Sequence, residues 1–172
     1  LAGRQGKAPD SGLTIPRLAE ITAVGGWPGN LGKSPAEAVA ANRSYIDEIR
    51  RVDIGRLDGV RRDPAKIGRL FGSLARHEST PATTATIASD TGSDESVIGE
   101  DTVRGYVDAL ERLMVVEPQP AWAPHLRSRS RLRQGPKRRF VDPSLAVASL
   151  RATPERLLTD LRHVGEVLHE IA

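Results

Sequence analysis

Residues 100–118 read EDTVRGYVDALERLMVVEP, and their apolar pattern changes period part of the way along. Over 102–114 the apolar residues recur three and four apart, which predicts a helix with one buried face. They are Val103, Tyr106, Val107, Leu110, Leu113 and Met114. Asp101 stands just before this helix and is expected to cap it with a side-chain oxygen. Residues 114–118 are short, partly β-branched and end at a proline, so they predict a strand.

A strongly basic segment comes next. Between residues 127 and 139 the chain carries seven Arg or Lys and no acid. Residues 140–143, Phe-Val-Asp-Pro, then predict a second strand and a stop. The order helix, strand, basic loop, strand is typical of the back half of a winged helix-turn-helix.

The helices upstream are predicted from their start signals. Ser34-Pro35 with Glu37 forms a capping box for a helix that runs to about Val52. Its predicted inner face is Ala38, Ala41, Asn42, Tyr45, Ile46 and Ile49. Asp63-Pro64 opens the first core helix, and Thr83 or Thr84 caps a second one that ends at Gly92. The third core helix is the one over 102–114.

The sequence therefore predicts a mainly α fold, α+β by virtue of a small two-stranded wing. Residues 1–12 are expected to be a flexible linker and 13–62 a helical N-terminal segment. Residues 63–142 are expected to form the winged-helix core, and 143–172 a helical tail. Within that tail Asp142-Pro143 and Thr153-Pro154 are the helix starts.

Composition limits the class of protein. The 172 residues contain no Cys, which excludes disulfides and thiolate metal sites. No apolar run approaches the roughly 20 residues that a membrane helix needs, so no membrane partner is predicted. These features predict a cytoplasmic protein. The net charge is +3, but without the seven basic residues it would be slightly negative, so the positive field is local. The absence of an initiating Met suggests a piece of a longer chain.

The sequence predicts no catalytic, cofactor-binding or metal-ligating residue and no small-molecule substrate. Residues 29–34, GNLGKS, resemble a phosphate-binding loop, but Trp27 stands where that motif needs its first Gly. The better interpretation is a turn followed by a capped helix. The four His are scattered, and His77 is expected at a helix C-terminus, where a positive charge suits the dipole. The fragment is therefore predicted not to be an enzyme.

The basic segment is the one feature with an obvious ligand, because Arg-rich loops neutralise phosphates. The third helix is a poor groove reader, since Asp108 and Glu111 accompany Arg104 and Arg112 on its outer face. Contact with the nucleic-acid backbone is therefore favoured over base readout. A solvated loop, or one that meets an acidic protein surface, remains the alternative. The candidate nucleic-acid-binding residues are Arg104, Arg127, Arg129, Arg131, Arg133, Lys137, Arg138 and Arg139.

Five motifs in order carry a family resemblance. They are VGGWP at 24–28, RSYIDEI at 43–49 closing on Asp53-Ile54, IASDTG at 87–92, TVRGYVDALE at 102–111 and RFVDPSL at 139–145. The set resembles a C-terminal domain of unknown function, the "forty-one forty-three" type, fused to AAA-type P-loop ATPases of bacteria and archaea. The resemblance implies an ATPase domain upstream, with ATP and Mg there and no cofactor in this fragment.

The same resemblance implies a restriction-endonuclease-like domain that begins near His163 and is cut off at Ala172. Where the family's last helix usually carries Glu, this chain has His169, beside Glu170. Two functions follow as hypotheses. The first is a non-catalytic winged-helix module of a larger ATPase that contacts DNA backbone through its basic wing. The second is a protein-protein or regulatory module that docks the ATPase and binds no nucleic acid.

Overall fold

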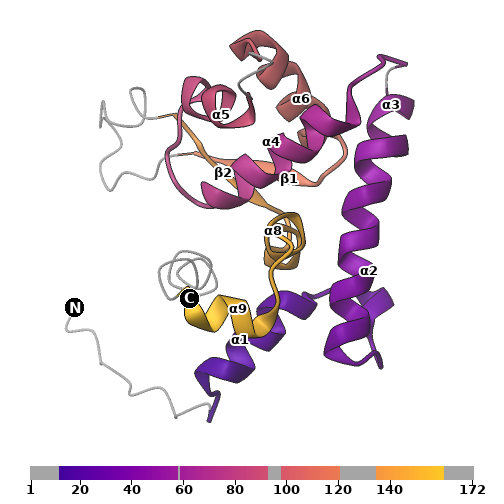
Figure 1. Cartoon of the computed structure of the whole chain (residues 1–172), viewed down its shortest axis with the longest axis vertical. Coiled ribbons are helices and arrows are strands. Elements are labelled where there is room, and N and C mark those ends of the chain that lie inside the picture. Colours follow the sequence, from indigo (N-terminus) through magenta and orange to yellow (C-terminus); the bar gives the residue numbers. More distant parts are fainter. Residues whose placement is uncertain (1–11, 58, 93–97, 121–134, 161–172) are drawn as a thin grey trace, which may run out of the picture.

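The computed structural model describes residues 12–57, 59–92, 98–120 and 135–160, which form a mainly helical fold with one two-stranded antiparallel sheet (Figure 1). The N-terminal elements are α1 (Ile15–Val24), η1 (Pro28–Asn30), α2 (Pro35–Glu48), the π-helical turn η2 (Ile49–Asp53) and α3 (Ile54–Arg56). The remaining elements are α4 (Pro64–Arg76), α5 (Thr84–Thr91), α6 (Glu100–Arg112), β1 (Val116–Gln119), β2 (Lys137–Phe140), α8 (Pro143–Ser149) and α9 (Pro154–Thr159).

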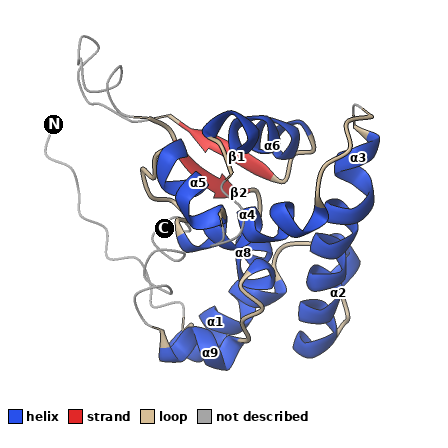
Figure 2. Cartoon of the chain, turned by 45° about the horizontal axis from the view of Figure 1, so that its top comes forward, coloured by secondary structure: helices blue, strands red, loops and turns tan. Residues whose placement is uncertain are grey.

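The predicted hairpin is present, but its second strand was placed too late. β1 and β2 are antiparallel, with Val116 opposite Phe140 and Glu117 opposite Arg139. β2 ends at Phe140, so Lys137, Arg138 and Arg139 lie in the strand and not in the basic loop. A charged strand is tolerated here because Arg139 pairs directly with Glu117 across the ladder. Figure 2 shows both strands beside α4 and α6.

Helix α6 exists as predicted but is shifted by two residues. Its N-cap is Gly99, so the prediction that Asp101 caps it is wrong, and Asp101 lies in the first turn. Met114 is also outside the helix, in a left-handed conformation with φ of 53° and 79% exposed. The Val115 N–H donates to the Leu110 carbonyl, which ends the helix and turns the chain into β1. The apolar pattern ran past the helix because Met114 keeps the four-residue spacing from Leu110, although its side chain is exposed.

One hydrophobic core joins α2, α4, α5, α6, the hairpin and α8. Phe71 of α4 is 1% exposed and stacks on Phe140 of β2, with ring centroids 6.0 Å apart. Around this pair lie the buried side chains Ile46, Ile49, Ile54, Ile67, Leu70, Leu74, Ile87, Val103, Val107, Leu110, Val115, Val116 and Leu145. A smaller cluster joins α1, α2, α8 and α9 through Ala19, Ala23, Val39, Val147, Ala152 and Leu157.

Helix α2 begins as predicted at the Ser34 capping box, but its regular turns stop at Glu48, where η2 takes over. Of its predicted inner face, Ala38, Asn42, Ile46 and Ile49 are buried. Tyr45 is 39% exposed, so its assignment to the core is wrong. It lies edge-on to Trp27, with ring centroids 5.5 Å apart, because the loop before α2 brings the indole to the rim of the core.

The turn after α1 is fastened to the start of α8. Gly25 adopts φ of +74°, and the Gly26 N–H donates to Asp142 Oδ2 at 2.8 Å. Trp27 Nε1 donates to Ser144 Oγ at 2.9 Å, while Asp142 Oδ1 caps α8 by accepting from the Ser144 N–H. We call these five residues the Gly-Gly-Trp/Asp-Ser junction. It brings together two motifs 116 residues apart in the chain.

The capping box of α2 makes a testable pH prediction. Hydrogen bonds from the side chain and backbone of Ser34 lower the pKa of Glu37, with a smaller effect from Lys33. The stabilisation that this carboxylate gives is therefore present at neutral pH and lost as pH falls through the lowered pKa of the folded state. Ser34→Ala should move the Glu37 pKa back up and cost about 1 kcal/mol of stability. NMR titration of Glu37 and urea unfolding check this. Ser44→Ala, in the middle of α2, is the control and should leave the Glu37 pKa where it was.

Candidate nucleic-acid interface

Arg138 ties the hairpin to the N-terminus of α5. From β2 its Nη1 donates to the Ala82 carbonyl at 3.2 Å, and its Nη2 donates to Thr84 Oγ1 at 3.3 Å. The neighbouring backbone adds a second link, since the Ser79 N–H donates to the Arg138 carbonyl at 3.1 Å. Arg138 is half-buried. It therefore has a structural role in joining β2 to the segment between α4 and α5.

The other two basic residues of β2 differ from each other. Arg139 forms an ion pair with Glu117, and its Nε donates to Glu117 Oε1 at 2.6 Å. That carboxylate offsets the charge of Arg139 toward any anion. Lys137 is exposed at the first position of the strand, on the side of the segment that links β2 to β1. Arg127, Arg129, Arg131 and Arg133 belong to that linking segment and lie outside the described residues.

Arg104 lies on α6 among acids of the same helix. Its Nη1 is 2.6 Å from Asp101 Oδ1 and its Nη2 is 3.7 Å from Glu100 Oε2. Both partners lie in the first turn of the helix. The structure thus brings Arg104 together with carboxylates and not with Lys137, Arg138 or Arg139.

Further along, the same helix is also acidic. Burial raises the pKa of the Glu111 carboxyl, the charge of Asp108 raises it further, and Arg138 opposes both. This half-buried acid faces the Arg138 side of α6. Exposed acids on α6 would repel phosphates, so this helix is poorly suited to contact the backbone of a nucleic acid.

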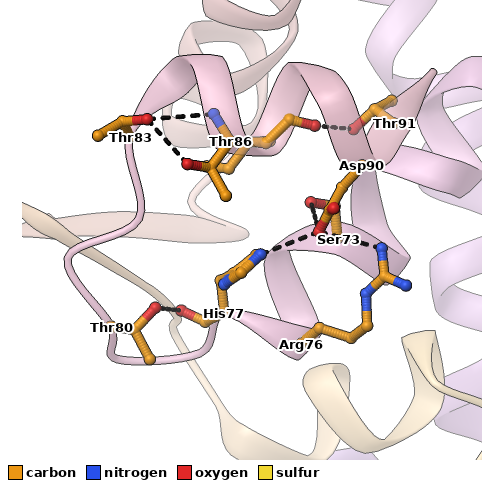
Figure 3. A network of polar contacts seen from close by, with 9 residues as sticks. Ser73, Arg76, His77, Thr80, Thr83, Thr86, Asp90 and Thr91 are labelled. Atoms are coloured by element: carbon orange, nitrogen blue, oxygen red, sulfur yellow. Dashed lines mark hydrogen bonds and ion pairs between the residues drawn. The ribbon is translucent and has the colours of Figure 1, made fainter.

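A polar cluster between α4 and α5 was not predicted (Figure 3). Asp90 Oδ2 lies 2.9 Å from His77 Nε2, 3.1 Å from Arg76 Nη2 and 3.4 Å from Ser73 Oγ. His77 is at the C-terminus of α4 as expected, and Asp90 is its additional partner. The sequence holds no signal for this contact, because only the packing angle of the two helices brings residue 90 to residue 77.

The described residues offer no metal centre: nowhere in 12–57, 59–92, 98–120 or 135–160 do three His, Asp or Glu gather closely enough to hold an ion. Within the same ranges, no helix has the length and hydrophobicity to cross a membrane.

The fold and this basic hairpin define a small helical module with a two-stranded appendage. Residues 15–156 match the family described as a domain of unknown function, DUF8612, and the chain belongs to that family. The sequence analysis expected a domain of unknown function, which the match confirms, but of the "forty-one forty-three" type, which the match does not show. The match says nothing about fusion to an ATPase. Comparisons with curated proteins and with solved structures gave no match.

Proposed function

We propose that α4, α5, α6 and the β1–β2 hairpin form a winged-helix module that contacts the backbone of nucleic acid through the hairpin. The observation that carries the proposal is the hairpin itself. Its strands are paired, and the segment between them holds four arginines at alternate positions, leading into Lys137. Such a segment carries several positive charges within a short stretch of sequence, which suits phosphates spaced along a duplex.

Two contacts on the far side of β2 support the winged-helix assignment. The Ser79 N–H donates to the Arg138 carbonyl, and the Phe140 N–H donates to the buried carboxylate of Glu78 at 3.2 Å. The segment between α4 and α5 therefore lies along β2 opposite β1. In a winged helix this is where the chain between the first and second helices meets the wing.

Within this proposal the helix α6 does not read bases. Arg104 is engaged by Asp101 and Glu100, and Asp108 is exposed on the same helix. Binding is then largely electrostatic and independent of sequence. The module itself carries no catalysis, and it works in the cytoplasm as part of a larger P-loop ATPase, which the resemblance implies.

The salt dependence of binding tests the proposal. Replacing the four segment arginines by Ala should lower the slope of log affinity against log salt by roughly 3.6, if each neutralises one phosphate at about 0.9 per contact. The measurement is fluorescence anisotropy with a labelled duplex at several salt concentrations. The four replaced residues are Arg127, Arg129, Arg131 and Arg133.

The matched control removes the same charge elsewhere, at four exposed basic residues, and should change the slope little. These are Lys33, Arg56, Arg61 and Arg156. Equal effects of the two quadruple variants would show that only net charge matters. No binding by the natural chain even at low salt would reject nucleic acid as the partner.

A second function, docking onto a protein, is favoured by one observation. Three of the described basic candidates, Arg104, Arg138 and Arg139, are already engaged by groups of this chain. If the ATPase is the partner, the arginine variant should lose co-purification with it, while DNA binding is absent in both forms.

A further inference from the structure

A cavity of about 230 Å³ lies between the end of α2, α4 and the end of α8. Three arginines line it, one from α2, one from η2 and one that follows α8. One acid, a glycine and an aromatic residue are among the other lining residues. In chain order the three arginines and these three residues are Arg43, Asp47, Arg50, Gly68, Phe71 and Arg151. None of them belongs to the basic hairpin.

The guanidinium of Arg43 is hydrogen-bonded to described residues through Nη2 but not through Nε. Its Nη2 donates to the Arg151 carbonyl at 3.0 Å and to the Ala152 carbonyl at 2.8 Å, and so covers the end of α8. Its Nε is buried and donates no hydrogen bond to any described residue. A buried charged donor without an acceptor is energetically costly, so this atom indicates a missing acceptor.

Arg50 shows the same feature. Its Nε is 3.2 Å from Asp47 Oδ1, which makes an ion pair, yet the geometry is not that of a hydrogen bond and the Nε is buried without an acceptor among the described residues. Its Nη1 lies over Gly68, where a Cβ would come within 2.9 Å of it. A glycine inside helix α4 weakens that helix. Because Gly68 has no side chain, it leaves room for the Arg50 guanidinium beside the cavity.

Arg151 completes the group. It adopts a left-handed backbone with φ of 52°, a conformation that a residue with a long side chain seldom takes. Arg151 is exposed and is one of the residues that line the cavity. The turn that ends α8 thus adds a third basic residue to a lining that already holds Arg43 and Arg50.

Three arginines and one aspartate line this cavity, so the formal charges of its lining residues sum to about +2. Like charges gathered around one partly buried space destabilise the fold unless an anion joins them. A phosphoryl group carries about −1.5 to −2 charge at pH 7 and presents several acceptor oxygens to planar guanidinium forks. We propose that this cavity binds a phosphoryl dianion, either inorganic phosphate or the phosphate of a small phosphomonoester, through Arg43, Arg50 and Arg151.

Isothermal titration of the full chain with inorganic phosphate, and separately with glycerol phosphate, tests the proposal. We expect saturable binding that sulfate competes with and that chloride at equal ionic strength does not. The tighter of the two ligands identifies the source of the phosphoryl group. Absence of saturable binding by both would overturn the proposal, and water would then satisfy the two buried Nε groups.

Two glycines of α4 give a matched pair of variants. Gly68→Ala pushes a methyl group against the Arg50 guanidinium and should weaken phosphate binding about tenfold or more, the effect of losing one charged hydrogen bond. Gly72→Ala, one turn later, has nothing within 4 Å of the added methyl and should bind phosphate as the natural chain does. Equal affinities of the two variants would contradict the assignment.

Arg151→Asn separates binding from folding at the third arginine. Asn tolerates the left-handed backbone, and the carbonyl that Arg43 contacts is kept. We expect this variant to unfold at the same temperature or above in the absence of phosphate and to bind phosphate about tenfold more weakly. Unchanged affinity would remove Arg151 from the site.

Discussion

Phe71→Ala is expected to lower the free energy of unfolding by about 3–5 kcal/mol, a large part of the stability of a domain of this size. Phe71 is almost fully buried and stacks on Phe140, so its loss leaves a hollow between α4 and the hairpin. Urea unfolding followed by circular dichroism measures the change. Leu31→Ala is the control, because Leu31 is 83% exposed and should cost less than about 0.5 kcal/mol.

The position of Phe71 also predicts which part of the variant loosens first. The Phe140 N–H donates to the buried Glu78 carboxylate, and Phe140 loses its ring partner when Phe71 is removed. Exchange of the Phe140 amide hydrogen should therefore accelerate more than exchange in α2. A uniform acceleration along the whole chain would show that the hairpin is no more dependent on Phe71 than the rest of the core.

Gly25→Ala should lower the free energy of unfolding by about 2–5 kcal/mol. The alanine would be held in a left-handed backbone conformation, and its methyl group would clash with neighbouring atoms. The backbone φ of +74° disfavours any side chain, and a Cβ here would lie 2.4 Å from Ser144 Oγ and 2.5 Å from Asp142 Oδ1. The Gly-Gly-Trp/Asp-Ser junction would then separate, and α8 would lose its side-chain cap. Thermal unfolding followed by circular dichroism measures the loss of stability.

Gly29→Ala is the matched control for this junction. Gly29 lies four residues further on, in η1, and a Cβ added there meets nothing within 4 Å. Its replacement should change stability by less than about 1 kcal/mol. If both glycine variants were equally stable, the close approach to Asp142 and Ser144 would not be what selects glycine at position 25.

Most helices could be predicted from the sequence, because capping residues and prolines mark where they begin. Asp63-Pro64, Thr83, Asp142-Pro143 and Thr153-Pro154 each begin a helix as expected, and Gly92 ends one. The errors fell where tertiary contacts override local pattern. Met114 continues the apolar period but is turned outward by the chain reversal, and the charged β2 is held in its ladder by Glu117.

The contacts of the candidate site could be predicted less well from the sequence. The eight basic residues could be named, but their partners could not, since Arg138 is bound by Ala82 and Thr84, more than 50 residues earlier. The phosphoryl cavity left no pattern at all, because residues 43, 50, 68 and 151 converge only once α2, α4 and α8 have packed. The buried hydrogen bond from Asn30 Nδ2 to Asn42 Oδ1, at 3.0 Å, likewise could not be predicted from the sequence.

Helices α1 and α9, the first and last elements of the described chain, pack on each other at one end of the molecule (Figure 1). A pulling force that enters through residues 12 and 160 would meet this pair first. Their contact is made largely of small side chains, such as Ala19 and Ala23, with Leu157. It should break at a lower force than the aromatic stack between α4 and β2. Under such a force we therefore expect the contact between α1 and α9 to break while the hairpin is still folded.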